Sequence, residues 1–234
     1  MRAQLKLVVA VLASMLVLGG VATAAEDRTL GLGDRGADVT EVQIRIAGWA
    51  ADGPQRTFVA VDGIFGPATE AALKRFQRAY GLTASGQVDA PTQQALDALA
   101  DPDGSTAHFD FAEFHSKDGA GFGGGKVGSS TVQENVRRLM YKLEAVRKKA
   151  GDAPITINSG FRSIAHNSDV GGASNSQHMY GIAADIVISG TSVGQAIGHA
   201  QTSGFSGIIR YNTFTHVDSR VEYGYGAGSW YWAT

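Results

Sequence analysis

The sequence predicts an α+β protein in two parts: a small all-α three-helix bundle, then an α+β domain with a small antiparallel sheet. Residues 30–99 carry apolar side chains at helical spacing. Residues 100–107, Ala-Asp-Pro-Asp-Gly-Ser-Thr-Ala, have the composition of a linker. Residues 108–234 show one long helical pattern and then several short apolar runs, an order typical of α+β domains. The length of 234 residues is sufficient for two such domains.

The first part contains a weak internal repeat. Residues 63–73 recur loosely as residues 86–96, with Gly, Thr, Ala and Leu in register. Each copy is expected to form a turn followed by a short helix, with Thr69 and Thr92 as caps or first-turn residues. An earlier helix is indicated by a third set of apolar residues, Val39, Val42, Ile46 and Trp49. Together these segments predict a three-helix bundle.

The second part is expected to begin with a long helix. Thr131-Val132-Gln133-Glu134 has the pattern of a capping box, and Gly151 is expected to end the helix. A second helix is expected over residues 193–200. Short apolar runs predict strands at residues 155–157, 183–188, 208–209 and 214–217.

Composition excludes some classes of function. The net charge of −2 and the lack of a basic run give no electrostatic case for a nucleic-acid partner. The chain has no cysteine, and it exceeds the size at which secreted domains usually need disulfides. Any metal site must therefore use histidine and carboxylate ligands.

The N-terminus has the features of a secretory signal, expected over residues 1–25. Arg2 and Lys6 precede an apolar run over residues 7–18, and Ala22-Thr23-Ala24 fits the small-residue cleavage rule. The alternative is a permanent anchor, but the run is shorter than the roughly 20 residues that span a bilayer. We therefore expect a secreted protein without a membrane partner after the signal is removed, and a monomer.

Two of the six histidines lie in unusual surroundings. His178 precedes Asp185, which interrupts an apolar run, and His216 lies in a later expected strand. A buried carboxylate needs a cation or hydrogen-bond donors. A turn at Gly181 would allow His178 and Asp185 to converge, whereas on a continuous helix they would be about 10 Å apart along the axis. Two histidines and one carboxylate form a usual catalytic zinc set, although the spacing alone leaves a structural role equally open.

The pattern Ser176-x-His178-x-x-Gly181-x-Ala183-x-Asp185 is similar to the signature of the zinc D-Ala-D-Ala carboxypeptidases and their relatives, peptidase family M15. Residues 159–163 resemble the arginine segment of that family, and residues 215–218 resemble the segment with its third ligand. The resemblance covers residues 108–234.

This resemblance implies a set of roles. Zn²⁺ would be held by His178, Asp185 and His216. Arg162 would bind the terminal carboxylate of the substrate or polarise its scissile carbonyl, to which the guanidinium fork is suited. Ser176 would form a hydrogen bond to the substrate or to a zinc ligand.

One position departs from the family pattern. Many members carry Glu or Asp three residues before the last histidine ligand, and this sequence has Thr213, which cannot act as a base. Asp218 is expected on the same strand face as His216. Asp218 would then act as the catalytic base or orient a ligand imidazole, and the sequence leaves both roles open.

Residues 30–99 resemble the peptidoglycan-binding domain of the three-helix type. The residues that carry this match are 32–36, 61–69 and 73–77. The resemblance implies a wall-targeting domain without catalytic function, peptidoglycan as the partner, and an extracellular or cell-wall location. A generic helical bundle remains the alternative from periodicity alone.

The two resemblances together predict a zinc-dependent D-alanyl-D-alanine carboxypeptidase that removes the terminal D-Ala of stem peptides with metal-activated water. One alternative is a zinc endopeptidase that cleaves cross-links or another stem bond. Another is a wall-binding protein with a degenerate peptidase domain, which the intact His178, Asp185 and His216 argue against and Thr213 leaves open.

Overall fold

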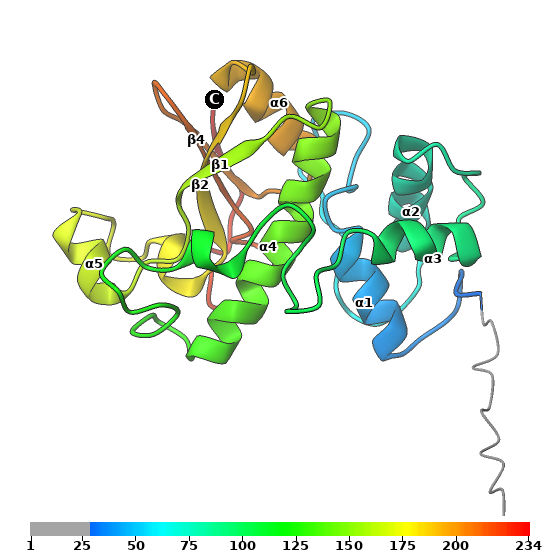
Figure 1. Cartoon of the computed structure of the whole chain (residues 1–234), viewed down its shortest axis with the longest axis horizontal. Coiled ribbons are helices and arrows are strands. Elements are labelled where there is room, and N and C mark those ends of the chain that lie inside the picture. The colour runs from blue at the N-terminus through cyan, green and yellow to red at the C-terminus, as the bar shows by residue number, and fades with distance from the viewer. Residues whose placement is uncertain (1–28) are drawn as a thin grey trace, which may run out of the picture.

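The structure is a computed structural model that describes residues 29–234, so the expected signal segment, residues 1–25, lies outside the described residues. Figure 1 shows a three-helix domain on one side of the long helix α4 and the sheet on the other side. Within residues 29–234, no helix combines the length and the apolar character needed to cross a bilayer.

The N-terminal domain consists of α1 (Ala37–Arg45), α2 (Pro67–Ala79) and α3 (Ala90–Asp97), so the three-helix prediction is confirmed. A buried glutamine fixes each copy of the internal repeat. Gln43 Nε2 donates to Thr69 Oγ1 at 3.2 Å, and Gln77 Nε2 donates to Thr92 Oγ1 at 3.0 Å. Each glutamine also accepts a hydrogen bond from a backbone N–H of the loop before the helix. Both threonines therefore lie in first turns, and the N-cap of α3 is Asp89.

The second domain has a five-stranded sheet in the order β1-β2-β4-β3-β5. Its elements are η1 (Phe111–Phe114), α4 (Ser129–Lys149), β1 (Ile155–Ser159), α5 (Ile164–Asp169), η2 (Gln177–Tyr180), β2 (Ala183–Ile188), α6 (Val193–Thr202), β3 (Gly207–Arg210), β4 (Thr215–Asp218) and β5 (Tyr231–Ala233). The α+β class is thus confirmed.

Two details of the expected architecture are wrong. The sheet is mixed rather than antiparallel, because the three-residue strand β5 returns along the edge of the sheet and pairs in parallel with β3. The expected capping box does not form either, since α4 begins at Ser129 with Gly128 as its N-cap. The carboxylate of Glu134 instead accepts a hydrogen bond from Arg138 at 2.9 Å.

The two faces of the sheet serve different purposes. Helices α4 and α6 pack against one face and enclose the hydrophobic core. Because side chains alternate along a strand, the residues between the core positions point to the opposite face. Core positions are Ala184, Ile186, Ile188, Ile208 and Val217, and the intervening residues include Asp185, Ile209, His216 and Asp218.

The two domains pack closely along α4. Tyr141 and Ala145 of α4 belong to the hydrophobic core of the three-helix domain. Gly48 lies directly against α4, and Lys149 Nζ donates to its carbonyl oxygen at 2.9 Å. The expected linker is folded too, since Ser105 and Thr106 are buried.

Substituting Gly48 by alanine tests this close approach. A Cβ at Gly48 would clash with the Cβ of Ala145 and lie 3.0 Å from the Lys142 backbone. We expect Gly48→Ala to lower the free energy of unfolding by about 1–3 kcal/mol, measured by urea denaturation. Gly53→Ala is the matched control, because a Cβ there meets no atom within 4 Å. Equal stability of the two variants would contradict close packing at Gly48.

Candidate active site

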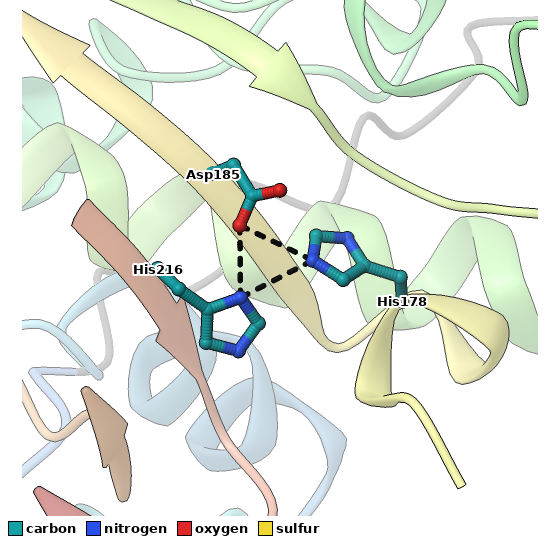
Figure 2. Close-up of side chains that lie close together, drawn as sticks. All are labelled: His178, Asp185 and His216. Atoms are coloured by element: carbon teal, nitrogen blue, oxygen red, sulfur yellow. Dashed lines mark hydrogen bonds and ion pairs between the residues drawn. The ribbon is translucent and has the colours of Figure 1, made fainter. Parts of the chain in front are cut away.

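Two neighbouring strands and one helical turn bring three side chains together. Asp185 on β2 lies directly opposite His216 on β4 in the antiparallel register. His178 lies on the 3₁₀ turn η2, and Gly181 ends this turn with a left-handed backbone, φ 74°. This conformation favours glycine. The chain can therefore reverse between His178 and Asp185, and both side chains reach the same point (Figure 2).

The three side chains form a compact triangle of ligand atoms. His216 Nδ1 lies 2.9 Å from Asp185 Oδ1. His178 Nε2 lies 3.3 Å from the same oxygen and 3.2 Å from His216 Nδ1. Tetrahedral zinc with bonds of 2.0–2.2 Å separates its ligand atoms by about 3.3 Å. The set of two imidazoles and one carboxylate therefore fits zinc in spacing and in chemistry, and among the described residues it is the group that could hold a metal ion.

Each of these side chains is held from behind by a second protein group. His178 Nδ1 donates to the carbonyl oxygen of Gly160 at 2.6 Å, which leaves the Nε2 lone pair facing the triangle. His216 Nε2 contacts Asp218 Oδ2 at 3.0 Å. Asp185 Oδ2 accepts from Arg162 Nη2 at 2.7 Å. Such outer partners are typical of metal sites, because they fix the tautomer and the orientation of the ligands.

Burial and hydrogen bonding set the charges of the cluster. Burial opposes ionisation of Asp185, but the neighbouring imidazoles of His178 and His216 hold its pKa far below the usual range. Burial lowers the pKa of His178. Burial also disfavours a charged His216, yet hydrogen bonds to Asp185 and Asp218 raise its pKa to about 9. A metal binds the carboxylate and the neutral imidazole forms of these groups, so zinc would displace the extra proton of His216 when it binds.

Asp218 lies behind His216 rather than in the open part of the site. Its side chain is fully buried, and Arg220 binds it through Nε and Nη2. The neighbouring strand leaves space for it, because a Cβ at Gly207 would overlap the Asp218 carboxylate. Of the two roles that the sequence left open, this geometry favours orientation of the His216 imidazole over catalysis as a base.

The triangle opens into a cavity of about 550 Å³. Arg162 and Ser176 line this cavity, so the structure places both expected substrate-contacting residues beside His178, Asp185 and His216. Within the described part of the chain, Asp185 is the only carboxylate that lines the cavity. Thr213 is exposed in the turn between β3 and β4 and does not line it.

Several residues of the site were missed by reasoning from the sequence. Arg220 and Tyr231 both line the cavity, and Arg220 Cζ lies 5.4 Å from the centre of the Tyr231 ring. The spacing Asp218-Ser219-Arg220 was a signal for the first, because residues two apart can share one side of an extended segment. Tyr231 lies on the short strand β5, whose pairing no pattern in the sequence indicated.

Comparisons with known proteins agree with this geometry. The family model described as Peptidase M15 matches residues 107–218, and the model described as putative peptidoglycan binding domain matches residues 35–96. A zinc D-Ala-D-Ala carboxypeptidase of Streptomyces albus G is 43% identical over 194 residues, which cover 81% of this chain and 74% of that relative.

Two solved structures match more locally. The SleB N-terminal domain is 34% identical and covers 30% of this chain and 90% of its own, with a TM-score of 0.26. The endolysin of Burkholderia AP3 phage is 27% identical and covers 54% of this chain and 38% of its own, also with a TM-score of 0.26. The extent of the identity to the zinc carboxypeptidase, together with the family match over the second domain, shows that the chain belongs to the peptidase M15 family and carries a peptidoglycan-binding domain before its peptidase domain.

Proposed function

We propose that this protein is a zinc-dependent D-alanyl-D-alanine carboxypeptidase that hydrolyses the terminal D-Ala of peptidoglycan stem peptides. The observation that carries the proposal is the triangle of His178, Asp185 and His216, whose ligand atoms all lie within 4.8 Å of one another at a cavity. The zinc D-Ala-D-Ala carboxypeptidase that is 43% identical supports the same substrate class.

Each residue of the site has a defined part in this proposal. His178, Asp185 and His216 hold the zinc ion. Bound zinc supplies a water whose pKa falls to about 7 and a Lewis acid for the scissile carbonyl. Arg162 is fixed beside the cluster by Ser159 Oγ at 2.8 Å and Asp185 Oδ2 at 2.7 Å and lines the cavity, where its charge would polarise that carbonyl. Ser176, the N-cap residue of η2 two residues before His178, lines the cavity and contacts the bound peptide.

Asp218 orients His216 in this account, and Asp218→Asn tests that role. An amide cannot stabilise the Nε2–H tautomer as a carboxylate does, so we expect zinc affinity to fall by about 10-fold to 100-fold. The measurement is a competition titration of zinc against a chelating dye. Asp169→Asn, an exposed change at the end of α5, is the control. Unchanged zinc affinity with a lower kcat would instead support a role for Asp218 as the base.

The peptidoglycan-binding domain relates the protein to the cell wall. We extend this to a secreted, monomeric enzyme that acts on the wall. The support for secretion is the signal pattern over residues 1–25, and the support for wall targeting is the domain that matches residues 35–96.

The test uses two substrates of the wall. A pentapeptide-stem muropeptide and a cross-linked dimer are incubated with the protein, with and without a zinc chelator, and analysed by mass spectrometry. We expect chelator-sensitive loss of one terminal alanine from the pentapeptide. Splitting of the dimer with an intact pentapeptide would replace the proposal by an endopeptidase, and no change in either substrate would indicate a wall-binding protein.

A further inference from the structure

The cavity contains a second arginine that the roles above do not use. Arg162 and Arg220 are the two cationic side chains, apart from histidines, that line it within the described residues. We propose that Arg220 binds the free C-terminal carboxylate of the substrate and so makes the enzyme select chain ends. This inference rests on the proposed carboxypeptidase function and names the residue that would give it its specificity.

The guanidinium of Arg220 is fixed before any substrate binds. Nε donates to Asp218 Oδ1 at 2.9 Å, and Nη2 donates to Asp218 Oδ2 at 2.6 Å. The Tyr231 ring lies 5.4 Å from Cζ. The Arg220 side chain is only 14% exposed. A binding group held in place in this way loses little conformational freedom when it engages a ligand.

One edge of this guanidinium remains available. Nη1 of Arg220 makes no hydrogen bond to any residue of the described chain, whereas Nε and Nη2 are both engaged. The carboxylate that neutralises Arg220 is fully buried and does not line the cavity. The Arg220 guanidinium therefore faces the cavity, and the Asp218 carboxylate lies behind it. An arginine presented in this way is suited to a charge-assisted hydrogen bond with a carboxylate.

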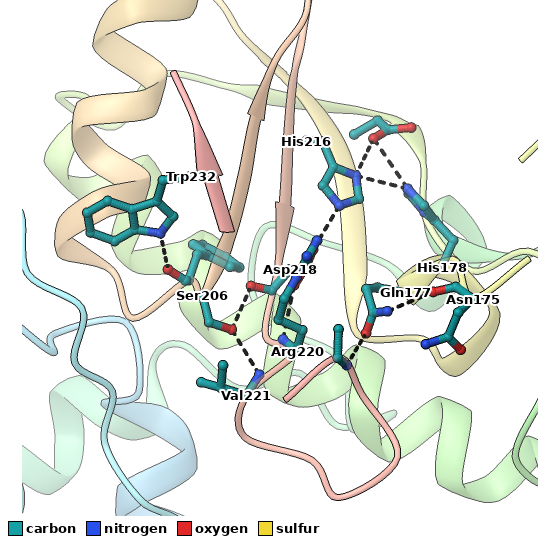
Figure 3. Close-up of polar contacts among 12 residues, drawn as sticks. Asn175, Gln177, His178, Ser206, His216, Asp218, Arg220, Val221 and Trp232 are labelled. Atoms are coloured by element: carbon teal, nitrogen blue, oxygen red, sulfur yellow. Dashed lines mark hydrogen bonds and ion pairs between the residues drawn. The ribbon is translucent and has the colours of Figure 1, made fainter. Parts of the chain in front are cut away.

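The positions of the two arginines assign them different parts of the substrate. Arg162 Nη2 contacts the outer oxygen of Asp185, so it lies beside the cluster itself. Arg220 is one layer further away, because it binds the Asp218 carboxylate, which in turn contacts His216 Nε2 (Figure 3). The His216 ring presents Nδ1 to the cluster and Nε2 to Asp218.

The substrate has two groups in a matching order. In a peptide that ends in D-Ala, the scissile carbonyl and the terminal carboxylate are one residue apart, about 3.3–3.6 Å along an extended chain. The nearer arginine, Arg162, then faces the carbonyl, and the more distant Arg220 faces the carboxylate. An internal stem bond has no free carboxylate at this distance and would leave Arg220 Nη1 without a partner.

The experiment compares an acylated D-Ala-D-Ala peptide with its C-terminal amide. Binding of both peptides to the metal-free full chain is followed by NMR titration, because this isolates recognition from hydrolysis. The wild type is expected to bind the carboxylate form more tightly than the amide by about 10-fold to 100-fold. Arg220→Ala is expected to remove this preference while leaving the affinity for the amide unchanged.

Two further variants make the result decisive. Arg210→Ala removes the same charge from an exposed position on β3 outside the cavity, and it should keep the full preference. Arg220→Lys keeps the charge but lacks the planar fork, so its preference for the carboxylate should be smaller than that of the wild type. This variant keeps the test possible if Arg220→Ala does not fold. Two results would overturn the inference. One is a folded Arg220 variant whose affinities for the carboxylate and the amide peptide fall by the same factor, and the other is a folded variant that keeps the full preference for the carboxylate.

Turnover separates this inference from the function on which it rests. D-Ala release by the zinc-loaded wild type tests the carboxypeptidase itself. If the wild type releases D-Ala and Arg220→Lys retains the full preference for the carboxylate, only the role of Arg220 is wrong. If the preference depends on Arg220 but the wild type cleaves a different bond, the proposed function is wrong and the carboxylate site stands.

Discussion

The variant His178→Ala is expected to lose zinc and, with it, hydrolysis of the terminal D-Ala. His178 supplies one of three ligand atoms, and among the described residues the group that could hold a metal ion contains only His178, Asp185 and His216. The site would keep one imidazole and one carboxylate. Because the reaction depends on metal-activated water, we expect the rate to fall by at least about a thousandfold.

Metal content and activity are measured separately on the same sample. Zinc per chain is determined by elemental analysis after dialysis, and D-Ala release is followed with a pentapeptide. His199→Ala on α6 is the control, because this partly buried histidine does not line the cavity. Full zinc content in His178→Ala would contradict the ligand assignment, and normal activity without zinc would contradict the mechanism.

The largest loss of stability is expected from Lys142→Met. The Lys142 side chain is 2% exposed, and its Nζ donates to Gly204 O at 3.0 Å, to Ser219 Oγ at 2.8 Å and to Glu222 Oε1. Methionine fills a similar volume but leaves the Glu222 carboxylate buried without its cation. Removing one partner of a buried pair typically costs about 3–5 kcal/mol. Lys142 also binds Ser219 and Glu222 in the segment that directly follows Asp218. The substitution should therefore loosen this part of the site as well as lower the free energy of unfolding.

Two further variants distinguish this effect from a general loss of charge. Lys148→Met on the same helix removes an exposed ion pair with Asp152, for which less than about 1 kcal/mol is expected. The double variant Lys142→Met/Glu222→Leu removes both charges and should recover most of the lost free energy. The free energies of unfolding come from urea denaturation of the metal-free proteins. Equal losses of unfolding free energy in Lys142→Met and Lys148→Met would show that the buried ion pair stabilises the fold no more than the exposed one.

The loss in Lys142→Met should depend on pH in a defined direction. Burial already raises the pKa of Glu222 above its ordinary 4.5, although Lys142 opposes this. Without Lys142 the pKa of Glu222 rises further, so the folded state holds a proton that the unfolded state releases. Stability of the variant then falls as pH rises above about 4.5. We expect a smaller difference from the wild type at about pH 5 than at about pH 8, and a larger difference at acid pH would contradict the argument.

The candidate metal site could be predicted because local signals in the sequence agree with one another. Asp185 interrupts an apolar strand, Gly181 permits the sharp turn before it, and His216 lies on an apolar strand that pairs with β2. Each signal depends on a few neighbouring residues. The three helices of the first domain were predictable for the same reason, since their apolar spacing and the repeat of Thr69 and Thr92 are local features.

The rest of the site depends on contacts between distant segments. The position of Asp218 depends on the space left by Gly207 on β3, and that of Tyr231 on the parallel pairing of β5 with the same strand. A strand of three residues is too short for alternation to reveal it. The start of α4 was misplaced because the side chain of Glu134 pairs with Arg138 one turn later instead of with its own N-terminus. Such competition between partners is settled only in the folded chain.

The measurement that tests the central claim most directly is a zinc titration of the metal-free full chain, with D-Ala release from a pentapeptide stem as the readout. The structure predicts that activity rises in proportion to added zinc and saturates at one zinc per chain, because His178, Asp185 and His216 form a single site. His178→Ala should show no such rise. Release of D-Ala by the metal-free chain, or equal recovery in His178→Ala, would contradict the assignment of catalysis to zinc held by these three residues.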